Sequence, residues 1–338
     1  MKSDEINIHL VGIATSLGSD CITADDLAKR FPDRFQSGSE VTTKVGVTKL
    51  YKFSDDEDLV DVSVETAMRL LDGLGIKLND INGVFGISNP TSETLLPTFT
   101  TMVTAKMGLT NVISDHVGIG CAGGIQALRA AYNQLVVDSL FNKYSYYLVI
   151  IGDQTIRMMD PEDYKTALLF SESVVALILT NTPQQGYKIE RIGTKTLGGS
   201  EVDVLRLNNP YGSRQKIEKI MMEGNGVYKF GVKILPHILG LIDLIEIPGK
   251  TYFIPHQANL RMLDAMIQKA GLSYDQVYTN GIKTIGNTSQ SAVFFGLADA
   301  LQNDLFDKNY DVILGAFGAE LQIGGVLLKP DFDKFNLF

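Results

Sequence analysis

The chain has 338 residues, 45% of them hydrophobic and 20% charged, which is ordinary for a globular protein with one large core or two fused halves. The formal net charge of −9 argues against broad nucleic-acid binding. No apolar run reaches the roughly 18 residues that span a bilayer, so no membrane segment is expected. The N-terminal MKSDEINIHL lacks the apolar stretch of a signal peptide, and Cys21 and Cys121 are the only cysteines. We therefore expect a cytoplasmic protein without a disulfide framework or a metal cluster.

Short apolar runs alternate with helical patterns along the whole chain, as in α/β proteins. In the first half they predict strands at 6–15, 81–88, 114–120, 146–153 and 172–181, and helices at 59–76, 97–107 and 122–137. After a polar stretch at 182–186, they predict strands at 187–197, 250–257, 310–318 and 321–330, a strand that passes into a turn at 282–289, and helices at 226–245, 259–271 and 291–302. Pro236 interrupts the helical pattern at 226–245. The repeated order predicts a duplicated architecture, divided into 1–181 and 182–338.

Cys121 lies where a strand pattern meets a helix pattern, in DHVGIGCAGGIQALRAAYNQLV. At a helix N-terminus, unpaired backbone N–H groups and the helix dipole favour a thiolate, so this position predicts a lowered pKa and a nucleophile. The alternative is a small buried structural cysteine, the commoner role of a free thiol. A hydrolase nucleophile elbow requires glycine two residues before the nucleophile, and Ile119 stands there instead. Cys21 has no comparable setting and is interpreted as structural.

A histidine and an asparagine mark two further junctions between strand and helix patterns. His256, in IPHQANLRML, follows an apolar strand at the sheet edge where α/β proteins present functional groups. His9 and His237 are interpreted as structural, and the role of His116 stays open. Asn287, in GNTSQSA, occupies a glycine-containing turn before a helix, where it is either an N-cap or an active-site group. Cysteine, histidine and asparagine at three such junctions together predict one active site.

These motifs resemble those of β-ketoacyl-acyl-carrier-protein synthase III and its relatives in the thiolase superfamily, over essentially the full length of the chain. MEGNGVYKFGV at 222–232 and FGAELQIGG at 317–325 support the same alignment. The resemblance implies an α/β protein with a duplicated thiolase fold, five-layered α-β-α-β-α with two mixed sheets. It also implies an acyltransferase that forms a homodimer and uses no cofactor.

In the enzymes that the chain resembles, an acyl thioester transfers its acyl group to the cysteine, here Cys121. A malonyl or β-ketoacyl thioester on acyl carrier protein then supplies a carbanion, which attacks the acyl group in a Claisen condensation. By this resemblance, His256 and Asn287 stabilise the carbanion, and the backbone N–H groups of Cys121 and Ala319 form the oxyanion hole. The acyl donor is expected to be acyl-ACP or acyl-CoA, in fatty-acid or polyketide biosynthesis.

The chain departs from the fatty-acid-initiating enzymes at several positions around the expected site. Those enzymes hold the adenine of coenzyme A between a tryptophan and an arginine, where this chain has Glu40 and Lys44, and Tyr164 stands at a further arginine position. Ser173 and Glu320 stand where glycine is usual. The departures favour a carrier-protein donor and indicate a specialised product rather than chain initiation.

Four further residues receive roles from the resemblance alone. Glu93 is a candidate accessory base, with a solvated loop carboxylate as the alternative, and Leu96 would line an acyl pocket across the dimer. Lys229 and Arg261 would dock the acidic carrier protein.

Other functions stay open alongside this interpretation. One is a ketosynthase and cyclase that joins two acyl chains into a pyrone, resorcinol or cyclohexanedione. Another is a non-catalytic partner subunit of a heteromeric synthase. A cysteine protease has the same order of cysteine, histidine and asparagine, but the aromatic signature around its cysteine is absent here.

Overall fold

A computed structural model describes residues 6–89, 96–118, 120–198, 205–206, 221–222 and 224–338. Its main sheet has the strand order β11-β12-β13-β8-β1-β7-β6-β4-β5, with β14 (Asn336–Leu337) paired to β1. The strands of the N-terminal half are β1 (His9–Leu17), β4 (Ile81–Ser88), β5 (Ile113–His116), β6 (Tyr146–Asp153) and β7 (Ser173–Thr180). Those of the C-terminal half are β8 (Gly186–Thr196), β11 (Thr251–Pro255), β12 (Asp311–Gly318) and β13 (Gln322–Asp331).

The two halves of the sheet repeat one topology. β4 pairs in parallel with β6 as β11 does with β12, and the pairings that follow, through β7 to β1 and through β13 to β8, are antiparallel. β5 lies beside β4, and a parallel bridge between Phe253 and Val277 occupies the corresponding place beside β11. A short β1–β8 ladder joins the halves, so the two predicted sheets form one hydrogen-bonded path. The division near residue 182 stays a prediction that this repetition supports.

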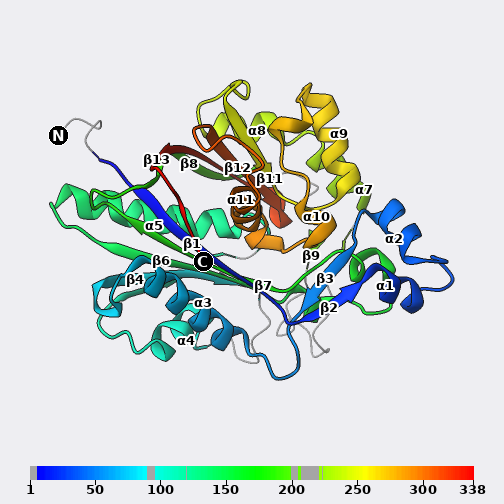
Figure 1. The fold of residues 1–338 in the computed structure, drawn as a ribbon, viewed down its shortest axis with the longest axis horizontal. Coiled ribbons are helices and arrows are strands. Elements are labelled where there is room, and N and C mark those ends of the chain that lie inside the picture. The colour runs from blue at the N-terminus through cyan, green and yellow to red at the C-terminus, as the bar shows by residue number, and fades with distance from the viewer. Residues whose placement is uncertain (1–5, 90–95, 119, 199–204, 207–220, 223) are drawn as a thin grey trace.

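Helices cover both outer faces of the sheet and fill the space between its halves (Figure 1). The outer helices are α3 (Leu59–Leu74) and α4 (Phe99–Lys106) on the N-terminal half, and α8 (Leu235–Leu241) and α9 (Leu260–Ala270) on the C-terminal half. The inner helices are α5 (Gly123–Leu140) and α11 (Ala292–Gln302). The predicted five-layered α/β fold is therefore confirmed.

Short elements complete the chain. Those in the first half are β2 (Asp20–Thr23), α1 (Ala24–Arg30), α2 (Gly38–Val45), β3 (Lys49–Lys52), η2 (Leu78–Asp80), η3 (Thr155–Met158) and α6 (Tyr164–Ala167). Those in the second half are β9 (Leu205–Arg206), β10 (Met221–Met222), α7 (Gly224–Gly231), η5 (Tyr274–Gln276), α10 (Gly281–Thr284), η6 (Ser289–Ser291) and η7 (Ala319–Leu321). No helix in the described ranges is long and apolar enough to cross a membrane.

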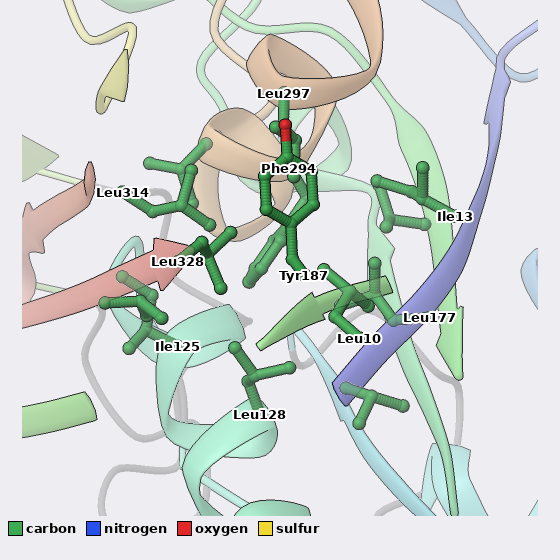
Figure 2. Close-up of a cluster of buried hydrophobic side chains, with 14 of the residues drawn as sticks. Leu10, Ile13, Ile125, Leu128, Leu177, Tyr187, Phe294, Leu297, Leu314 and Leu328 are labelled. Atoms are coloured by element: carbon green, nitrogen blue, oxygen red, sulfur yellow. The ribbon is translucent and has the colours of Figure 1, made fainter. Parts of the chain in front are cut away.

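Alternate residues of the central strands belong to different cores, because neighbouring side chains of a strand point to opposite faces. On β6, Tyr147, Val149 and Ile151 pack in the inner core, whereas Leu148 and Ile150 face the outer helices. The inner core joins α5 and α11 to both halves of the sheet (Figure 2). Burial on both faces explains why the sequence of this strand is continuously apolar rather than alternating.

Most predicted elements are confirmed within a few residues, but the strand predicted at 282–289 is wrong. Residues 281–284 form the one-turn helix α10, and the chain then turns through Gly286, whose φ is +85°. The pattern at 226–245 forms two helices rather than one interrupted helix. Pro236 lies in the first turn of the second of these, where its missing N–H is not needed.

Candidate active site

Cys121 lies just before α5, in a turn covered by the end of β12. Gly118 and Gly120 have φ values of +53° and +92°, which residues with a side chain rarely adopt. A Cβ on Gly318 would lie 2.8 Å from the Cys121 nitrogen, so only glycine lets the two turns approach this closely. A Cβ on Gly120 would lie 3.9 Å from the nitrogen of Ala319. The two backbone N–H groups predicted to form the oxyanion hole therefore belong to adjoining turns.

The Cys121 thiol is buried, with 8% of the residue exposed. Burial raises the pKa of this thiol from 9.0 to about 11, although a hydrogen bond with Ser289, 3.6 Å from Sγ, opposes the change. The expectation of a lowered pKa is therefore wrong, because desolvation of the thiolate outweighs the hydrogen bonds that favour it. A thiol of this kind needs a neighbouring group to accept its proton before it attacks a carbonyl carbon.

His256 directly follows β11 and is buried. Its backbone N–H donates to the Gly315 carbonyl at 2.7 Å, and its ring meets Phe317 edge to face at 5.4 Å. Burial lowers the pKa of the imidazole to about 4, so the ring is neutral near pH 7. Its Nδ1 has no hydrogen-bond partner among the residues described. A neutral imidazole carries one N–H, which suits it to donate to a developing oxyanion.

The remainder of the motif around His256 supports the turn and the helix that follows it. Gln257 Nε2 donates to the carbonyls of Pro255 at 2.8 Å and Tyr278 at 3.1 Å. The Asn259 side chain accepts from the first backbone N–H groups of α9 and caps that helix. These roles explain why glutamine and asparagine accompany the histidine in PHQAN.

Asn287 is held by backbone hydrogen bonds on both sides. Its N–H donates to the Leu169 carbonyl at 2.8 Å, and its carbonyl accepts from the Ser171 N–H at 3.0 Å. Its side-chain Oδ1 accepts from the Ser289 N–H at 2.8 Å. This hydrogen bond to Oδ1 fixes the orientation of the side-chain amide of Asn287, and the Nδ2 group can donate a hydrogen bond to a ligand.

Two serines of the segment FSESVVA reinforce the loop that carries Asn287. The Ser171 hydroxyl accepts from the Tyr51 N–H at 2.9 Å and donates to the Ile285 carbonyl. Ser173 Oγ lies 2.8 Å from the hydroxyl of Ser291. These two serines, of which Ser173 is the predicted departure from glycine, therefore add hydrogen bonds that join β3 and β7 to the loop.

Cys121, His256 and Asn287 line one cavity of about 1140 Å³. Four exposed basic side chains also line it, and no carboxylate is among its described lining residues. The basic residues are Arg34, Lys44, Lys165 and Arg261. Buried apolar side chains such as Phe35, Leu168 and Phe317 complete the wall. A cavity of this composition suits a long ligand with an apolar part and an anionic part.

Two of the predicted departures line this cavity. Lys44 and Tyr164 line it, whereas Glu40 does not. Glu40 forms an ion pair with Lys44 on α2, and the Arg34 guanidinium lies 4.7 Å from the centre of the Tyr164 ring. The negative charge of Glu40, which would repel an anionic ligand, is therefore offset by Lys44.

Of the remaining predicted residues that the structure describes, one lines the cavity. Lys229 and Arg261 are exposed on the packed helices α7 and α9, and only Arg261 lines the cavity. Leu96 is 79% exposed. Glu93 and the side chain of Glu320 lie outside the described residues.

Sequence reasoning missed two buried polar residues near the cysteine, Ser289 and Asp153. The one available signal for Asp153 was its position at the carboxyl end of an apolar strand, YYLVIIGD. Cys21 is exposed and both cysteines are free. No group of three or more metal-ligating side chains was found among the described residues.

Comparisons with known proteins agree with the resemblance seen in the motifs. The family model of 3-oxoacyl-(acyl-carrier-protein) synthase III matches residues 117–198, and the model of its C-terminal part matches 250–330. The matched segments contain Cys121, His256 and Asn287. The β-ketoacyl-(acyl-carrier-protein) synthase III of Clostridium botulinum is 26% identical over 334 residues, which cover 95% of this chain and 98% of that protein.

Solved structures share the fold. The 3-oxoacyl-(acyl carrier protein) synthase III of Pseudomonas aeruginosa PAO1 aligns with a TM-score of 0.81 at 21% identity, over 96% of this chain and 99% of that one. The priming β-ketosynthase from the R1128 polyketide biosynthetic pathway aligns with a TM-score of 0.83 at 20% identity, over 97% of each chain. The chain is a condensing enzyme of the thiolase superfamily that resembles 3-oxoacyl-(acyl-carrier-protein) synthase III.

Proposed function

We propose that this condensing acyltransferase accepts an acyl group on Cys121 and joins it to a malonyl thioester carried by acyl carrier protein. The observation that carries the proposal is the convergence of Cys121, His256 and Asn287, from three separate turns that each precede a helix, on one cavity. Each of the three has a different chemical property that the reaction requires: a nucleophilic sulfur, a neutral N–H donor and an oriented amide.

In the first step, the sulfur of Cys121 attacks the carbonyl carbon of an acyl thioester. A new sulfur–carbon bond forms, and the carbonyl oxygen takes up negative charge. The backbone N–H groups of Cys121 and Ala319 would stabilise that charge, because donors fixed in advance require no reorganisation during the reaction. The bond to the donor sulfur then breaks, and the donor thiol leaves with a proton.

In the second step, the malonyl thioester loses CO₂. The bonding electrons form an enolate whose oxygen accepts hydrogen bonds from His256 and from Asn287 Nδ2. The low pKa of His256, about 4, supports this role, because a neutral donor stabilises the enolate without protonating it. The enolate carbon then attacks the acyl carbon, and the Cys121 thiolate leaves.

The charges around the cavity support an acidic carrier protein as the partner. The whole chain has a net charge of −9, yet Arg34, Lys44, Lys165 and Arg261 line the cavity. A local basic surface on an acidic protein steers an acidic partner toward one site. Lys229 and Arg261 are the residues we propose for docking. A reducing cytoplasm is the proposed setting, since both cysteines are free.

We also propose that the chain forms a homodimer. β5 is an edge strand with mostly exposed residues, and Leu96, which precedes α4 in the chain, is 79% exposed. An open edge and an exposed apolar side chain are both stabilised by a second copy. Leu96 would then contact the acyl pocket of the partner, and Glu93 stays a candidate accessory base. Light scattering should give twice the chain mass of 37.0 kDa, and a monomer at working concentration would contradict the proposal.

Intact-mass analysis after incubation with a panel of acyl-ACP and acyl-CoA donors tests the function. We expect one acyl adduct, lost in Cys121→Ala and retained in Cys21→Ala, the matched control at an exposed free cysteine. Malonyl-ACP should then convert the adduct into a β-ketoacyl product. Absence of any adduct would support a non-catalytic subunit instead, and a cyclic product would support the cyclase alternative.

A further inference from the structure

Ser289 connects the nucleophile to a second buried group. Its hydroxyl oxygen lies 3.6 Å from Cys121 Sγ, within hydrogen-bonding distance for sulfur. The residue is buried and has a φ of +49°, in the left-handed region that residues with a side chain seldom occupy. Such strained positions occur preferentially at functional sites, because the surrounding structure has to hold them in place.

The second group is Asp153, the last residue of β6, which is fully buried. Its two oxygens accept hydrogen bonds from the Thr155 N–H at 2.9 Å and from Asn89 Nδ2 at 3.0 Å. The side chain of Ser289 and the backbone of Gln290 also favour the charged form, but burial dominates and raises the pKa of the carboxyl to about 7. Near neutral pH this carboxyl group is therefore able both to accept a proton and to return it.

The charge of Asp153 also acts on the thiol, since it is one of the causes that raise the pKa of Cys121. His256, which lines the cavity from β11, is the other titratable group to consider as a proton acceptor. The pKa of His256 is lowered to about 4 and that of Asp153 raised to about 7, so the carboxylate is the stronger base of the two. The Ser289 hydroxyl therefore lies beside the sulfur of Cys121 and also interacts with Asp153, the stronger base.

Building on the proposed acyl transfer to Cys121, we infer that Ser289 and Asp153 form a proton relay for the thiol. Ser289 Oγ takes the thiol proton while its own proton passes to the Asp153 carboxylate. As the sulfur–carbon bond to Cys121 forms and the bond to the donor sulfur breaks, the same path returns the proton to the departing sulfur. One proton moves out and back, and no oxidant, reductant or cofactor is required. Ser289 contacts the reacting sulfur, whereas Asp153 acts through Ser289.

The pH dependence of Cys121 alkylation by iodoacetamide tests the relay. The measurement is made in a Cys21→Ala background, so that one thiol reacts. The wild-type sequence at the site should show a rise in rate with a midpoint near pH 7 and a second rise toward pH 11 as the thiol ionises directly. Ser289→Gly, which is compatible with the left-handed backbone, should lose the first rise and react about 100-fold more slowly at pH 7.5. Asp153→Asn should lose it as well.

Ser291→Ala is the matched control. Ser291 is buried in the same turn, but its hydroxyl bonds to Ser173 and to the Thr288 carbonyl rather than to the sulfur. It should therefore keep both rises. Persistence of the first rise in Ser289→Gly would overturn the relay, as would its equal loss in Ser291→Ala.

A second measurement keeps the inference testable if Ser289→Gly does not fold. The rate of wild-type alkylation at pH 7.5 is measured in mixtures of H₂O and D₂O. A curved dependence, from two protons moving together, supports the relay, and a linear dependence contradicts it. Because alkylation needs no acyl donor, a protein with the first rise but no acyl adduct would retain the relay and refute the proposed function. Acyl transfer to Cys121 without the rise near pH 7 would refute the relay and leave the proposed function in place.

Discussion

Three of the four outer helices named above begin differently from the inner helices α5 and α11, whereas the fourth, α8, starts after Ile234 without a side-chain cap. The outer helices α3, α4 and α9 each start after an extended residue whose side chain accepts a hydrogen bond from a backbone N–H of the first turn: Asp58, Thr98 and Asn259. The inner helices α5 and α11 start after Ala122 and Ser291, which have helical backbone conformations and provide no side-chain cap. The three capped helices face solvent on one side, whereas α5 and α11 lie between the two halves of the sheet.

This difference in capping corresponds to a difference in role: the caps stabilise the outer helices, whereas the turns before the inner helices carry active-site residues. An outer helix is partly solvated, so a side-chain cap adds about 1 kcal/mol that packing does not supply. An inner helix is stabilised by burial, and the turn before it can hold functional groups instead of a cap. Cys121 precedes α5, and Asn287 and Ser289 precede α11. The two uncapped junctions, which the repeated topology makes equivalent, thus carry most of the proposed active site.

The largest effect we predict at the α11 junction is that of Asn287→Ala. Loss of the amide donor should slow malonyl-ACP decarboxylation by about 100- to 1000-fold, because the enolate loses one of its two stabilising hydrogen bonds. Acylation of Cys121 should change far less. The two steps are measured by CO₂ release and by intact mass. Asn225→Ala, at an exposed residue lining the same cavity, is the control. Equal losses in both steps would show that the variant disturbs the site as a whole.

The close approach of the two inner junctions predicts the next effect. A Cβ on Gly124 would lie 2.2 Å from the Gln290 carbonyl oxygen, so Gly124→Ala forces the starts of α5 and α11 apart. We expect a loss of about 1–3 kcal/mol in the free energy of unfolding, measured with urea. Gly240, inside the outer helix α8, has no atom within 4 Å of such a Cβ. Gly240→Ala should stabilise by about 0.5–1 kcal/mol. If both substitutions changed the free energy of unfolding in the same direction, the contrast between the closely packed inner junctions and the outer helices would be wrong.

The layered fold could be predicted from the sequence because most of it follows from local periodicity. β4 and β6 have the predicted bounds, since strands buried on both faces are recognisable as uninterrupted apolar runs. The strand at 282–289 was wrong because Ile282, Thr284 and Ile285 imitate strand alternation. The conformation there is fixed by backbone hydrogen bonds that Asn287 donates to Leu169 and accepts from Ser171, which no local pattern encodes.

The site could be predicted only where a functional residue stands at a visible junction. Cys121, His256 and Asn287 each follow a recognisable change from one pattern to another. Ser289 contacts the sulfur of Cys121 but lies 168 positions further along the chain, so no local pattern links the two residues. Asp153 follows an apolar run as many structural acidic residues do, so its position alone does not mark it as functional. The raised pKa of the thiol was missed for a related reason, since burial depends on how distant elements pack.

The smallest effect we predict concerns an outer helix. Asp58 Oδ1 accepts from the N–H groups of Val60 at 2.9 Å and Asp61 at 3.1 Å, so Asp58→Ala should lower the free energy of unfolding by about 1 kcal/mol. Asp56→Ala removes the same charge from an exposed residue just before the helix and should change stability by less than about 0.5 kcal/mol. Urea unfolding measures both, and neither variant should alter acylation of Cys121. A fall in acylation rate in Asp58→Ala alone would mean that the capped outer helices also support the chemistry, and the separation drawn between the two kinds of helix would fail.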